Sequence, residues 1–341
     1  MIMKAFTLTR YGKKEKLQLT EIAEPVVQEN DVLVQIHSAG VNSLDSLIRN
    51  GDFKLFLPYK TPFTLGHDVA GVVTKVGAKV SKFKVGDEVY SRPADYRVGT
   101  FAEYIAIDEK NVAPKPKNLS MEEAASIPLV GLTAWQALVE IGNLKSQQKV
   151  FIQAGSGGVG TLAIQLAKHL GAYVATTTSS DNIDLVKGLG ADVVIDYKKE
   201  DFEAKLKNYD LVLHSNKDPE ILEKSLRILK PGGQLVSLVG PPTPEFAATI
   251  GLPWYLKLVT TLLSLGVKKK AKKLNVTFAF LFMKAEGGQL SQITRLVESG
   301  VIKPVIDKVF PFEKTNEAMS YVEVGHAKGK VVIKIKDAIT I

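Results

Sequence analysis

The sequence predicts an α/β protein in which an N-terminal β-rich domain is joined to a doubly wound parallel sheet. Residues 1–120 alternate apolar and polar positions, as in 31–36, 69–76 and 87–90, and turn residues interrupt them often. This pattern is typical of a compact β-rich domain with a Greek-key or barrel-like core. From residue 121 onward, short apolar runs alternate with amphipathic stretches, which favours parallel strands joined by right-handed helical crossovers.

The second region divides into a regular series of elements. Strands are expected near residues 149–153, 172–178, 191–195, 209–213, 233–239 and 275–282, and helices near 121–141, 157–170, 181–189, 200–207, 218–229 and 289–299. Pro231-Gly232-Gly233 should stop the helix that precedes it. Residues 305–341 turn β-rich again, with 330–336 as the last strand. We therefore predict one domain from 1–120 together with 305–341, and a second from 121–304.

Size and composition narrow the classes of function. A chain of 341 residues that is 45% hydrophobic can bury a large core and favours two domains. It contains no cysteine, which excludes disulfides, thiolate zinc sites and a cysteine nucleophile. The N-terminal residues lack the order of a signal peptide, and no run reaches the ~18 apolar residues that span a bilayer. The expectation is a soluble, cytoplasmic protein.

The formal charge of +8 comes partly from a lysine cluster at 268–273. Such a cluster could indicate nucleic acid or an anionic membrane as a partner. The cluster has no interleaved aromatic residues and the chain has no nucleic-acid motif, so a solvated face is favoured and no nucleic-acid partner is expected.

The most informative stretch is 149–160, an apolar run followed by glycines at 155, 157 and 160. Leu162, Leu166 and Leu170 then recur every four residues, as on the buried face of a helix. Glycines at a strand-to-helix turn let the backbone approach a pyrophosphate, which the positive end of the helix attracts. In its strand–loop–helix context, the motif predicts a Rossmann domain that binds a dinucleotide.

The strand after the loop indicates which dinucleotide binds. It ends in Thr178-Ser179-Ser180, whereas an NAD site usually places an acid about 20 residues after the glycines. Asp181 is the nearest acid, and its position suits the N-terminus of the next helix better. A strand end rich in hydroxyls favours NADP(H), because a carboxylate there would repel a 2′-phosphate.

Residues 252–273 form an apolar segment that runs into the lysine cluster. One interpretation is an amphipathic helix lying on anionic lipid. The favoured interpretation is a helix that covers an active-site cleft or a subunit interface, so that membrane contact is the lesser alternative.

The order of these features resembles the medium-chain dehydrogenase/reductase superfamily, and most closely its zinc-independent quinone oxidoreductase and alkenal reductase branch. The resemblance covers the whole chain. Its motifs lie at residues 39–45 with Arg49 and Gly51, and at 65–73, 99–104, 131–134, 154–160 and 326–330. It implies an N-terminal GroES-like domain beside the Rossmann domain, and by analogy a homodimer or homotetramer.

The zinc enzymes of this superfamily carry a cysteine near Asn42 to Leu44 and a histidine in a Gly-His-Glu motif. Here the cysteine is absent and Gly66-His67-Asp68 remains. A catalytic zinc needs about three protein ligands, so we expect no metal site and a hydrogen-bonded His67. Loss of a Lewis acid shifts the expected substrates from alcohols to enals, enones and quinones.

The resemblance also implies cofactor contacts at particular residues. Asn42 and Thr133 would lie beside the nicotinamide, Phe280 and Phe282 would flank it, and Lys330 would lie near the phosphates. Gly155 would form the glycine turn, Val239 and Gly240 would lie near the ribose, and Tyr197 near the 2′-phosphate. The remaining expected contacts belong to the pyrophosphate loop and the 2′-phosphate site: Ser156, Gly157, Gly158, Val159, Thr178, Ser179 and Asn182.

One departure from the branch concerns the proton donor. Relatives often carry a Tyr or Lys where this chain has Leu47. The catalytic residues therefore remain unassigned, with water as the expected proton source, and Tyr59 and Tyr96 are candidates only by their polarity. The predicted function is NADPH-dependent reduction of α,β-unsaturated carbonyls or quinones. The alternative is a non-catalytic NADPH-binding structural or regulatory protein.

Overall fold

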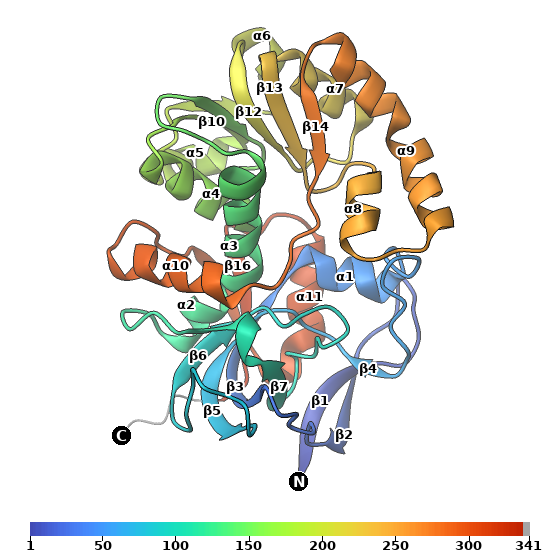
Figure 1. Ribbon diagram of the computed structural model, residues 1–341. Helices are drawn as coiled ribbons and strands as arrows, with labels where there is room; N and C mark the ends of the chain where they lie inside the picture. The colour runs from blue at the N-terminus through green and yellow to red at the C-terminus, as the bar shows by residue number, and fades with distance from the viewer. Residues whose placement is uncertain (337–341) are drawn as a thin grey trace. The chain divides into compact units, whose positions relative to one another are not determined.

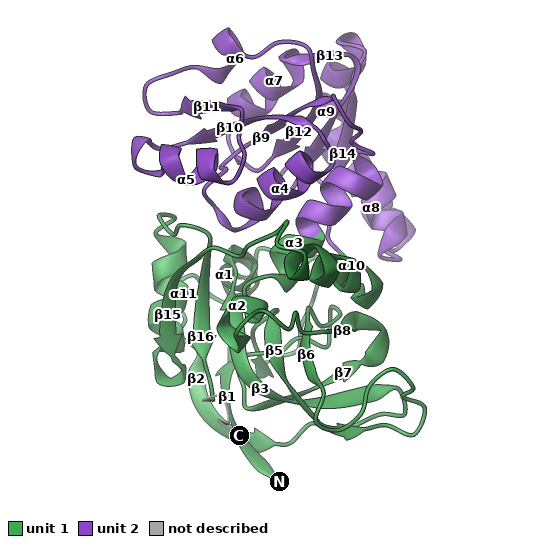
Figure 2. Ribbon diagram, turned by 90° about the vertical axis from the view of Figure 1, so that its left-hand side faces the viewer, with its two compact units in different colours: residues 1–132, 284–341 green, residues 133–283 purple. Residues whose placement is uncertain are grey.

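The computed structural model describes residues 1–336; the predicted segment 305–341 therefore extends beyond the described residues at 337–341. The chain forms two compact units (Figure 2). Unit 1 comprises Met1–Leu132 and Lys284–Ile341, and unit 2 comprises Thr133–Met283. No helix among the described residues is long and apolar enough to cross a membrane.

Unit 1 is built on two sheets. The smaller sheet has the order β2 (Gln18–Ala23), β1 (Ile2–Leu8) and β4 (Phe63–Thr64). The larger has the order β15 (Ile306–Pro311), β16 (Lys330–Lys334), β3 (Asp31–Val41), β5 (Val69–Val76), β6 (Glu88–Ser91) and β8 (Val112–Pro114), with β7 (Tyr104–Asp108) also paired to β3. Val32, Val34 and Ile36 alternate along β3 and enter one buried cluster. The expected β-rich domain is confirmed.

Most helices of unit 1 pack against strands of the larger sheet. They are α1 (Ser43–Asn50), α2 (Met121–Ala125), α10 (Gly287–Glu298) and α11 (Thr315–Glu323), with 3₁₀ turns η1 (Glu109–Asn111) and η4 (Phe312–Lys314); α3 (Pro128–Trp135) begins here and ends in unit 2. α2 begins at a reciprocal cap. The Glu123 amide donates to Ser120 Oγ at 3.1 Å, and the Ser120 amide donates to Glu123 Oε2 at 2.8 Å.

Unit 2 is a six-stranded parallel sheet in the order β11 (Val193–Asp196), β10 (Tyr173–Thr178), β9 (Lys149–Ile152), β12 (Tyr209–His214), β13 (Leu229–Ser237) and β14 (Thr277–Phe280). Numbered within the unit, this order is 3-2-1-4-5-6, that of a doubly wound dinucleotide-binding fold. The predicted fold class is confirmed. The order reverses between β9 and β12, and ligands bind such folds at the carboxyl ends of the strands beside this point.

Helices cover both faces of this sheet. They are α4 (Gly158–His169), α5 (Ile183–Gly188), α6 (Phe202–Lys205), α7 (Pro219–Arg227), α8 (Pro244–Thr249) and α9 (Trp254–Lys273), together with the 3₁₀ turn η3 (Ser180–Asn182) and the π-helical turn η2 (Gln136–Ile141). In Figure 1, α4 and α5 lie to the left of the strands, whereas α7 and α9 lie to the right. Opposite faces are expected where right-handed crossovers run in opposite directions from the first strand.

The structure differs from the sequence-based expectations in three places. The helix expected over 121–141 is broken between α2 and α3, because Pro128 has no amide to donate and disfavours helical backbone at Ile127. β13 begins at Leu229, and its pairing with β12 is irregular, so Pro231-Gly232-Gly233 lies in a bulge of the strand. The units divide after residues 132 and 283, whereas the sequence placed the boundaries at 120 and 304.

Candidate functional site

The glycine loop of unit 2 has the close-packed geometry that its sequence requires. A Cβ on Gly155 would lie 2.1 Å from Thr176 Oγ1, and one on Gly160 would lie 2.3 Å from the Ala154 carbonyl oxygen. Ala154 itself has a φ of 52°. Gly155 and Gly160 therefore leave no room for larger side chains in the short turn that joins β9 to α4.

The beginning of α4 presents unused backbone donors. The first intrahelical donor is the Thr161 amide, which bonds the Gly157 carbonyl at 3.0 Å. The amides of Gly158 and Val159 precede it at the helix N-terminus, where the peptide dipoles favour an anion. This is the arrangement that holds a pyrophosphate in dinucleotide-binding folds.

A cluster of neutral polar side chains adjoins the loop. Thr178 Oγ1 donates to Ser156 Oγ at 2.9 Å, and Asn182 Nδ2 contacts Ser156 Oγ at 3.3 Å and Ser179 Oγ at 3.2 Å. Asn182 Oδ1 is buried and has no hydrogen-bond partner. We call these four residues the hydroxyl cluster. The structure thus brings together side chains that the sequence separates by 26 positions.

Two further residues border the hydroxyl cluster. Tyr197 is exposed, and its amide bonds the Thr178 carbonyl oxygen at 3.2 Å, so it follows the neighbouring strand end as expected. Asp196 ends β11 and accepts hydrogen bonds from Ser180 Oγ and the Lys198 amide, which lower the pKa of the Asp196 carboxyl. Asp196 was not among the predicted site residues, because the search for an acid covered the end of β10 and Asp196 ends the next strand, β11.

Val239 and Gly240 follow β13 and line a cavity of about 310 Å³. Their amides donate to Ser237 Oγ at 3.4 and 2.8 Å, and Ser237 Oγ lies 2.9 Å from His214 Nδ1. Since the serine oxygen already accepts twice, its proton goes to Nδ1, which leaves the hydrogen on His214 Nε2. Burial lowers the pKa of His214 to about 4, so this imidazole is neutral.

The remaining cofactor candidates of unit 2 are apolar or buried. Phe280 lies on β14, and its ring packs edge-on against Phe246 at 5.3 Å between centroids. The Phe282 ring contacts the same phenyl at 5.2 Å. Thr133 is buried on α3. Phe280 and Phe282 thus share one aromatic cluster.

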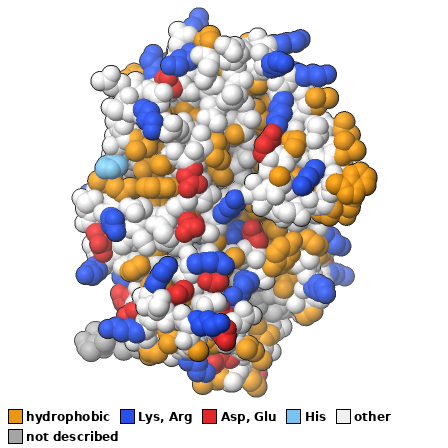
Figure 3. Space-filling view, in the orientation of Figure 1, with side chains coloured by type: hydrophobic (Ala, Val, Ile, Leu, Met, Phe, Trp, Pro, Cys, Tyr) orange, Lys and Arg blue, Asp and Glu red, His pale blue; other side chains and the backbone are white. Residues whose placement is uncertain are grey.

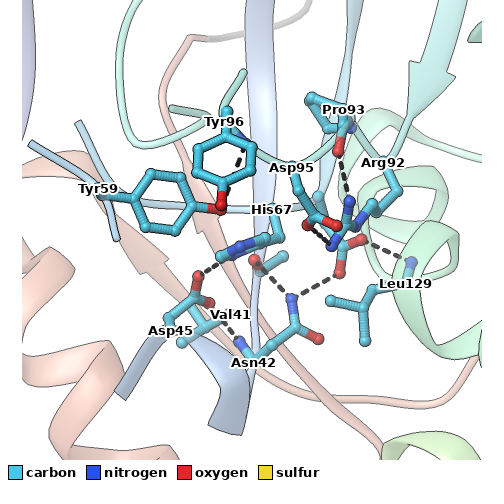
Figure 4. Close-up of polar contacts among 12 residues, drawn as sticks. Val41, Asn42, Asp45, Tyr59, His67, Arg92, Pro93, Asp95, Tyr96 and Leu129 are labelled. Carbon is cyan, nitrogen blue, oxygen red and sulfur yellow. Dashed lines mark hydrogen bonds and ion pairs between the residues drawn. The ribbon is translucent and has the colours of Figure 1, made fainter. Parts of the chain in front are cut away.

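In unit 1, a buried polar network surrounds Asn42 (Figure 4). It consists of Asn42, Asp45, His67, Asp68 and Lys330, of which Figure 4 labels the first three, and we call it the Asn42 network. The Asn42 amide nitrogen of the backbone donates to Asp45 Oδ2 at 2.8 Å, and Asn42 Nδ2 donates to Asp68 Oδ2 at 2.9 Å. Asn42 Oδ1 accepts from Lys330 Nζ. The orientation of the Asn42 side-chain amide is therefore fixed at both ends.

Lys330 is fully used within this network. Its ammonium also donates to the Val41 carbonyl at 3.0 Å and to Asp68 Oδ2 at 3.1 Å. An ammonium has three N–H groups, and three acceptors are present. The placement of Lys330 near the cofactor phosphates, which the resemblance implies, stays a prediction. Through its internal partners, Lys330 holds Asn42 and offsets the charge of Asp68.

The Asn42 network also contains the residues that could be considered as zinc ligands. His67 Nδ1 lies 2.6 Å from Asp45 Oδ1, and because a carboxylate only accepts, Nδ1 carries the hydrogen. His67 Nε2 is buried without a partner. Asp68 Oδ1 accepts the Leu129 amide at 2.7 Å, and its other oxygen accepts from Asn42 and Lys330. One free imidazole nitrogen does not make the ligand set of a zinc site, and residues 1–336 hold no group of three or more His, Asp or Glu placed for a metal.

The two tyrosine candidates lie together in unit 1. The Tyr59 and Tyr96 rings are 5.4 Å apart, and Tyr59 Oη accepts the Tyr96 amide at 3.5 Å. Burial, and next the charge of Asp95, raise the pKa of Tyr59, which keeps its hydroxyl protonated. Tyr96 is exposed and donates to the Phe56 carbonyl at 3.2 Å. Leu47 lies half-buried on α1 and offers no donor.

Comparisons with known proteins agree with these two units. Residues 28–117 match the family described as alcohol dehydrogenase GroES-like domain, and residues 189–333 match the family described as zinc-binding dehydrogenase. The chain is 39% identical over 342 residues to the 2-methylene-furan-3-one reductase of Solanum lycopersicum, covering 97% of this chain and 79% of the relative.

It is 36% identical over 342 residues to the chloroplastic NADPH-dependent alkenal/one oxidoreductase of Arabidopsis thaliana, with coverage of 97% and 79%. The solved quinone oxidoreductase of Coxiella burnetii superposes with a TM-score of 0.86 at 30% identity, covering 98% of this chain and all of that one. The chain therefore belongs to the medium-chain dehydrogenase/reductase superfamily, in the branch that contains the quinone oxidoreductases and the alkenal reductases.

Proposed function

We propose that the protein is an NADPH-dependent oxidoreductase that reduces α,β-unsaturated carbonyls and quinones. The observation that carries the proposal is the glycine loop of unit 2 together with the hydroxyl cluster beside it. The activities of two relatives, a 2-methylene-furan-3-one reductase and an NADPH-dependent alkenal/one oxidoreductase, support the same chemistry.

The cofactor contacts follow from the local geometry of unit 2. The amides that begin α4 would bind the pyrophosphate, because they are donors without intrahelical acceptors. The hydroxyl cluster would bind the 2′-phosphate through neutral donors, and it contains no carboxylate to repel a dianion. When bound, NADPH supplies the hydride that adds to the β-carbon of the activated alkene.

The residues of this chain would then position the reactants. The negative charge that develops on the substrate oxygen would be stabilised by hydrogen bonds. The Asn42 network holds its amide and its ammonium rigidly, since each donor already has an acceptor. These internal acceptors leave the network no free donor, so the hydrogen bonds to the charge that develops on the substrate oxygen would come from the solvent or from other groups. Leu47 cannot supply a proton, so the proton that the enolate takes up at its α-carbon would come from water.

The test is NADPH oxidation by the purified protein with 2-alkenals, vinyl ketones and ortho-quinones in parallel. Turnover with at least one class is expected, and faster with NADPH than with NADH. The variant Gly155→Ala should lose cofactor binding, because its Cβ would lie 2.1 Å from Thr176 Oγ1. Gly188→Ala is the matched control, since a Cβ at that position in α5 meets nothing within 4 Å.

The alternative, a non-catalytic NADPH-binding protein, makes a different prediction. NADPH would then raise the melting temperature of the wild type while no acceptor of the panel is reduced. That result would refute the proposed enzymatic activity and support the proposed cofactor site. The expected cytoplasmic location and the homodimer or homotetramer remain predictions.

A further inference from the structure

The helix α9 (Trp254–Lys273) buries Leu256, Val267 and Ala271 but leaves most of its large apolar side chains exposed. Its buried positions include Thr260 and Ser264, whose hydroxyls bond the carbonyls of Lys257 and Thr260 on their own helix, at 2.9 and 2.8 Å. A surface helix of a globular protein normally turns its apolar stripe to the core. Here much of the apolar surface faces the other way.

The outward face of α9 carries large apolar side chains. Of the 21 exposed large hydrophobic residues in the described chain, seven lie on this one helix of 20 residues: Trp254, Tyr255, Leu258, Val259, Leu262, Leu263 and Leu265. The exposed fraction is 77% for Trp254 and 64% for Leu262. Hydrophobic side chains gather at the right-hand edge of the molecule, where this helix lies (Figure 3). An apolar concentration of this kind marks an interaction site.

The same face continues into lysines. At about 100° per residue, Trp254, Leu258, Leu262, Leu265, Lys269 and Lys272 fall within one arc of about 80°. Lys268 and Lys270 pair with Glu245 and Glu223. Lys269, Lys272 and Lys273 are exposed and form no ion pair with the described residues. The outward face is thus apolar and aromatic over its first three turns and cationic at its C-terminal end.

The size and charge of this face decide between possible occupants. A stable protein interface uses about 20–30 residues a side, and the outward face of α9 supplies seven apolar residues and three lysines. The helix contains no acidic residue, so the α9 of a second copy would offer these lysines no partner of opposite charge. An anionic lipid surface complements both halves, because acyl chains accept leucines and headgroup phosphates attract lysines. Tryptophan and tyrosine favour that boundary.

We propose that the outward face of α9 docks the protein on an anionic lipid surface. Trp254, Leu258 and Leu262 lie at the boundary of headgroups and acyl chains, and Lys269, Lys272 and Lys273 contact the lipid phosphates. This goes beyond the proposed reductase activity and does not depend on it.

The first experiment is sedimentation of the full-length protein with vesicles. One preparation is phosphatidylcholine alone, and the other contains about a quarter phosphatidylglycerol. Binding to the anionic vesicles is expected, and little to the neutral ones. Loss of three lysines through Lys269→Gln, Lys272→Gln and Lys273→Gln should weaken binding about a hundredfold at low salt. The matched control neutralises three exposed lysines of unit 1, Lys13, Lys14 and Lys16, so both variants lower the formal charge from +8 to +5.

The second experiment tests the apolar half. Leu258→Ser with Leu262→Ser should weaken vesicle binding at least about tenfold, whereas serine at the exposed Leu19 and Leu55 should leave it unchanged. The chain has two tryptophans, so Trp135→Phe leaves Trp254 as the only one. Its emission should shift to the blue on anionic vesicles and be quenched by brominated acyl chains.

Three outcomes would overturn the proposal. The control lysine variant could lose binding as much as the α9 variant, which would mean that net charge alone attracts the vesicles. Trp254 could remain unquenched on sedimented vesicles. Analytical ultracentrifugation could show a dimer that Leu258→Ser with Leu262→Ser dissociates, in which case a second copy covers this face.

Discussion

Ser179 offers a single-residue test of the proposed cofactor preference. It belongs to the hydroxyl cluster, in which every side chain is neutral and can donate a hydrogen bond. In Ser179→Asp, the new carboxylate should repel a 2′-phosphate, so we expect the KM for NADPH to rise at least about tenfold and the KM for NADH to change little. Steady-state kinetics with both cofactors measures this, and Ser179→Asn is the uncharged control. An equal loss with both cofactors would contradict a 2′-phosphate site at Ser179.

The ion pair of Asp31 and Arg97 is the clearest single-residue determinant of stability in unit 1. Arg97 donates to both Asp31 oxygens, at 2.8 and 2.7 Å, and the Asp31 side chain is buried. Burial tends to raise the pKa of Asp31, but hydrogen bonds from Arg97 and the Gln28 amide and the Arg97 charge outweigh it, so the pKa is lowered. Arg97→Met would leave a buried carboxylate without its cation.

We expect Arg97→Met to cost about 2–3 kcal/mol of unfolding free energy, less than for a fully buried pair because Arg97 is partly exposed. Lys79→Met removes an exposed pair with Glu29 and should cost under about 1 kcal/mol. Urea denaturation followed by circular dichroism compares them. If both variants lost the same unfolding free energy, the burial of Asp31 would not determine how much its ion pair contributes to stability.

Residues whose role depends on the nearby backbone could be predicted from the sequence. Residues whose role depends on contacts with distant parts of the chain could not. The positions of Gly155 and Ser156 follow from a strand-to-helix turn. Asp31 and Arg97 are 66 positions apart, and Lys330 reaches Asn42 across 288 positions. Only the pairing of β16 with β3 brings that last contact about. No local pattern could have indicated it.

At the scale of elements, the parallel strands were predictable because each is a short apolar run before or after an amphipathic helix. The short helices could not be predicted in this way. α1, α8 and α11 are absent from the sequence-based expectations, and none exceeds nine residues. α8 begins where Thr243 Oγ1 accepts the Phe246 amide at 3.4 Å, with Pro244 at its first position. These signals are local caps, which give little hydrophobic periodicity to detect.

The start of α2 offers a test of capping in a short helix. Ser120→Ala removes the acceptor of the Glu123 amide, and we expect a loss of about 1 kcal/mol. The control is Ser43→Ala, an exposed serine at the first residue of α1 that does not cap it. Thermal unfolding followed by circular dichroism gives both values. A loss below that of Ser43→Ala would show that packing on the larger sheet, and not the cap, holds α2.

The whole molecule consists of two units with separate cores, and the sequence placed their boundaries differently. α2 packs on β3 and β5, and α10 packs on β8, so residues 121–132 and 284–304 belong to unit 1 although they read as part of the helical region. A helix gives no indication of which sheet it covers until its partner is known. Both tryptophans, Trp135 and Trp254, lie in unit 2. Tryptophan fluorescence therefore follows the unfolding of unit 2 alone.

This optical separation makes the pH dependence of unit 2 measurable. Burial lowers the pKa of His214 from 6.5 to about 4. Between these two values, His214 is protonated in the unfolded chain and neutral in the folded unit. The free energy of unfolding therefore falls as the pH decreases from about 6.5 to about 4, and its contribution from this group levels off below pH 4. The loss from this group should be about 2–3 kcal/mol at pH ~4.5. Urea denaturation followed by tryptophan fluorescence should show it as a pH slope that His214→Gln removes. His169→Gln, on the exposed end of α4, is the control that should keep the slope. If His214→Gln kept it too, the acid sensitivity of unit 2 would come from its carboxylates instead.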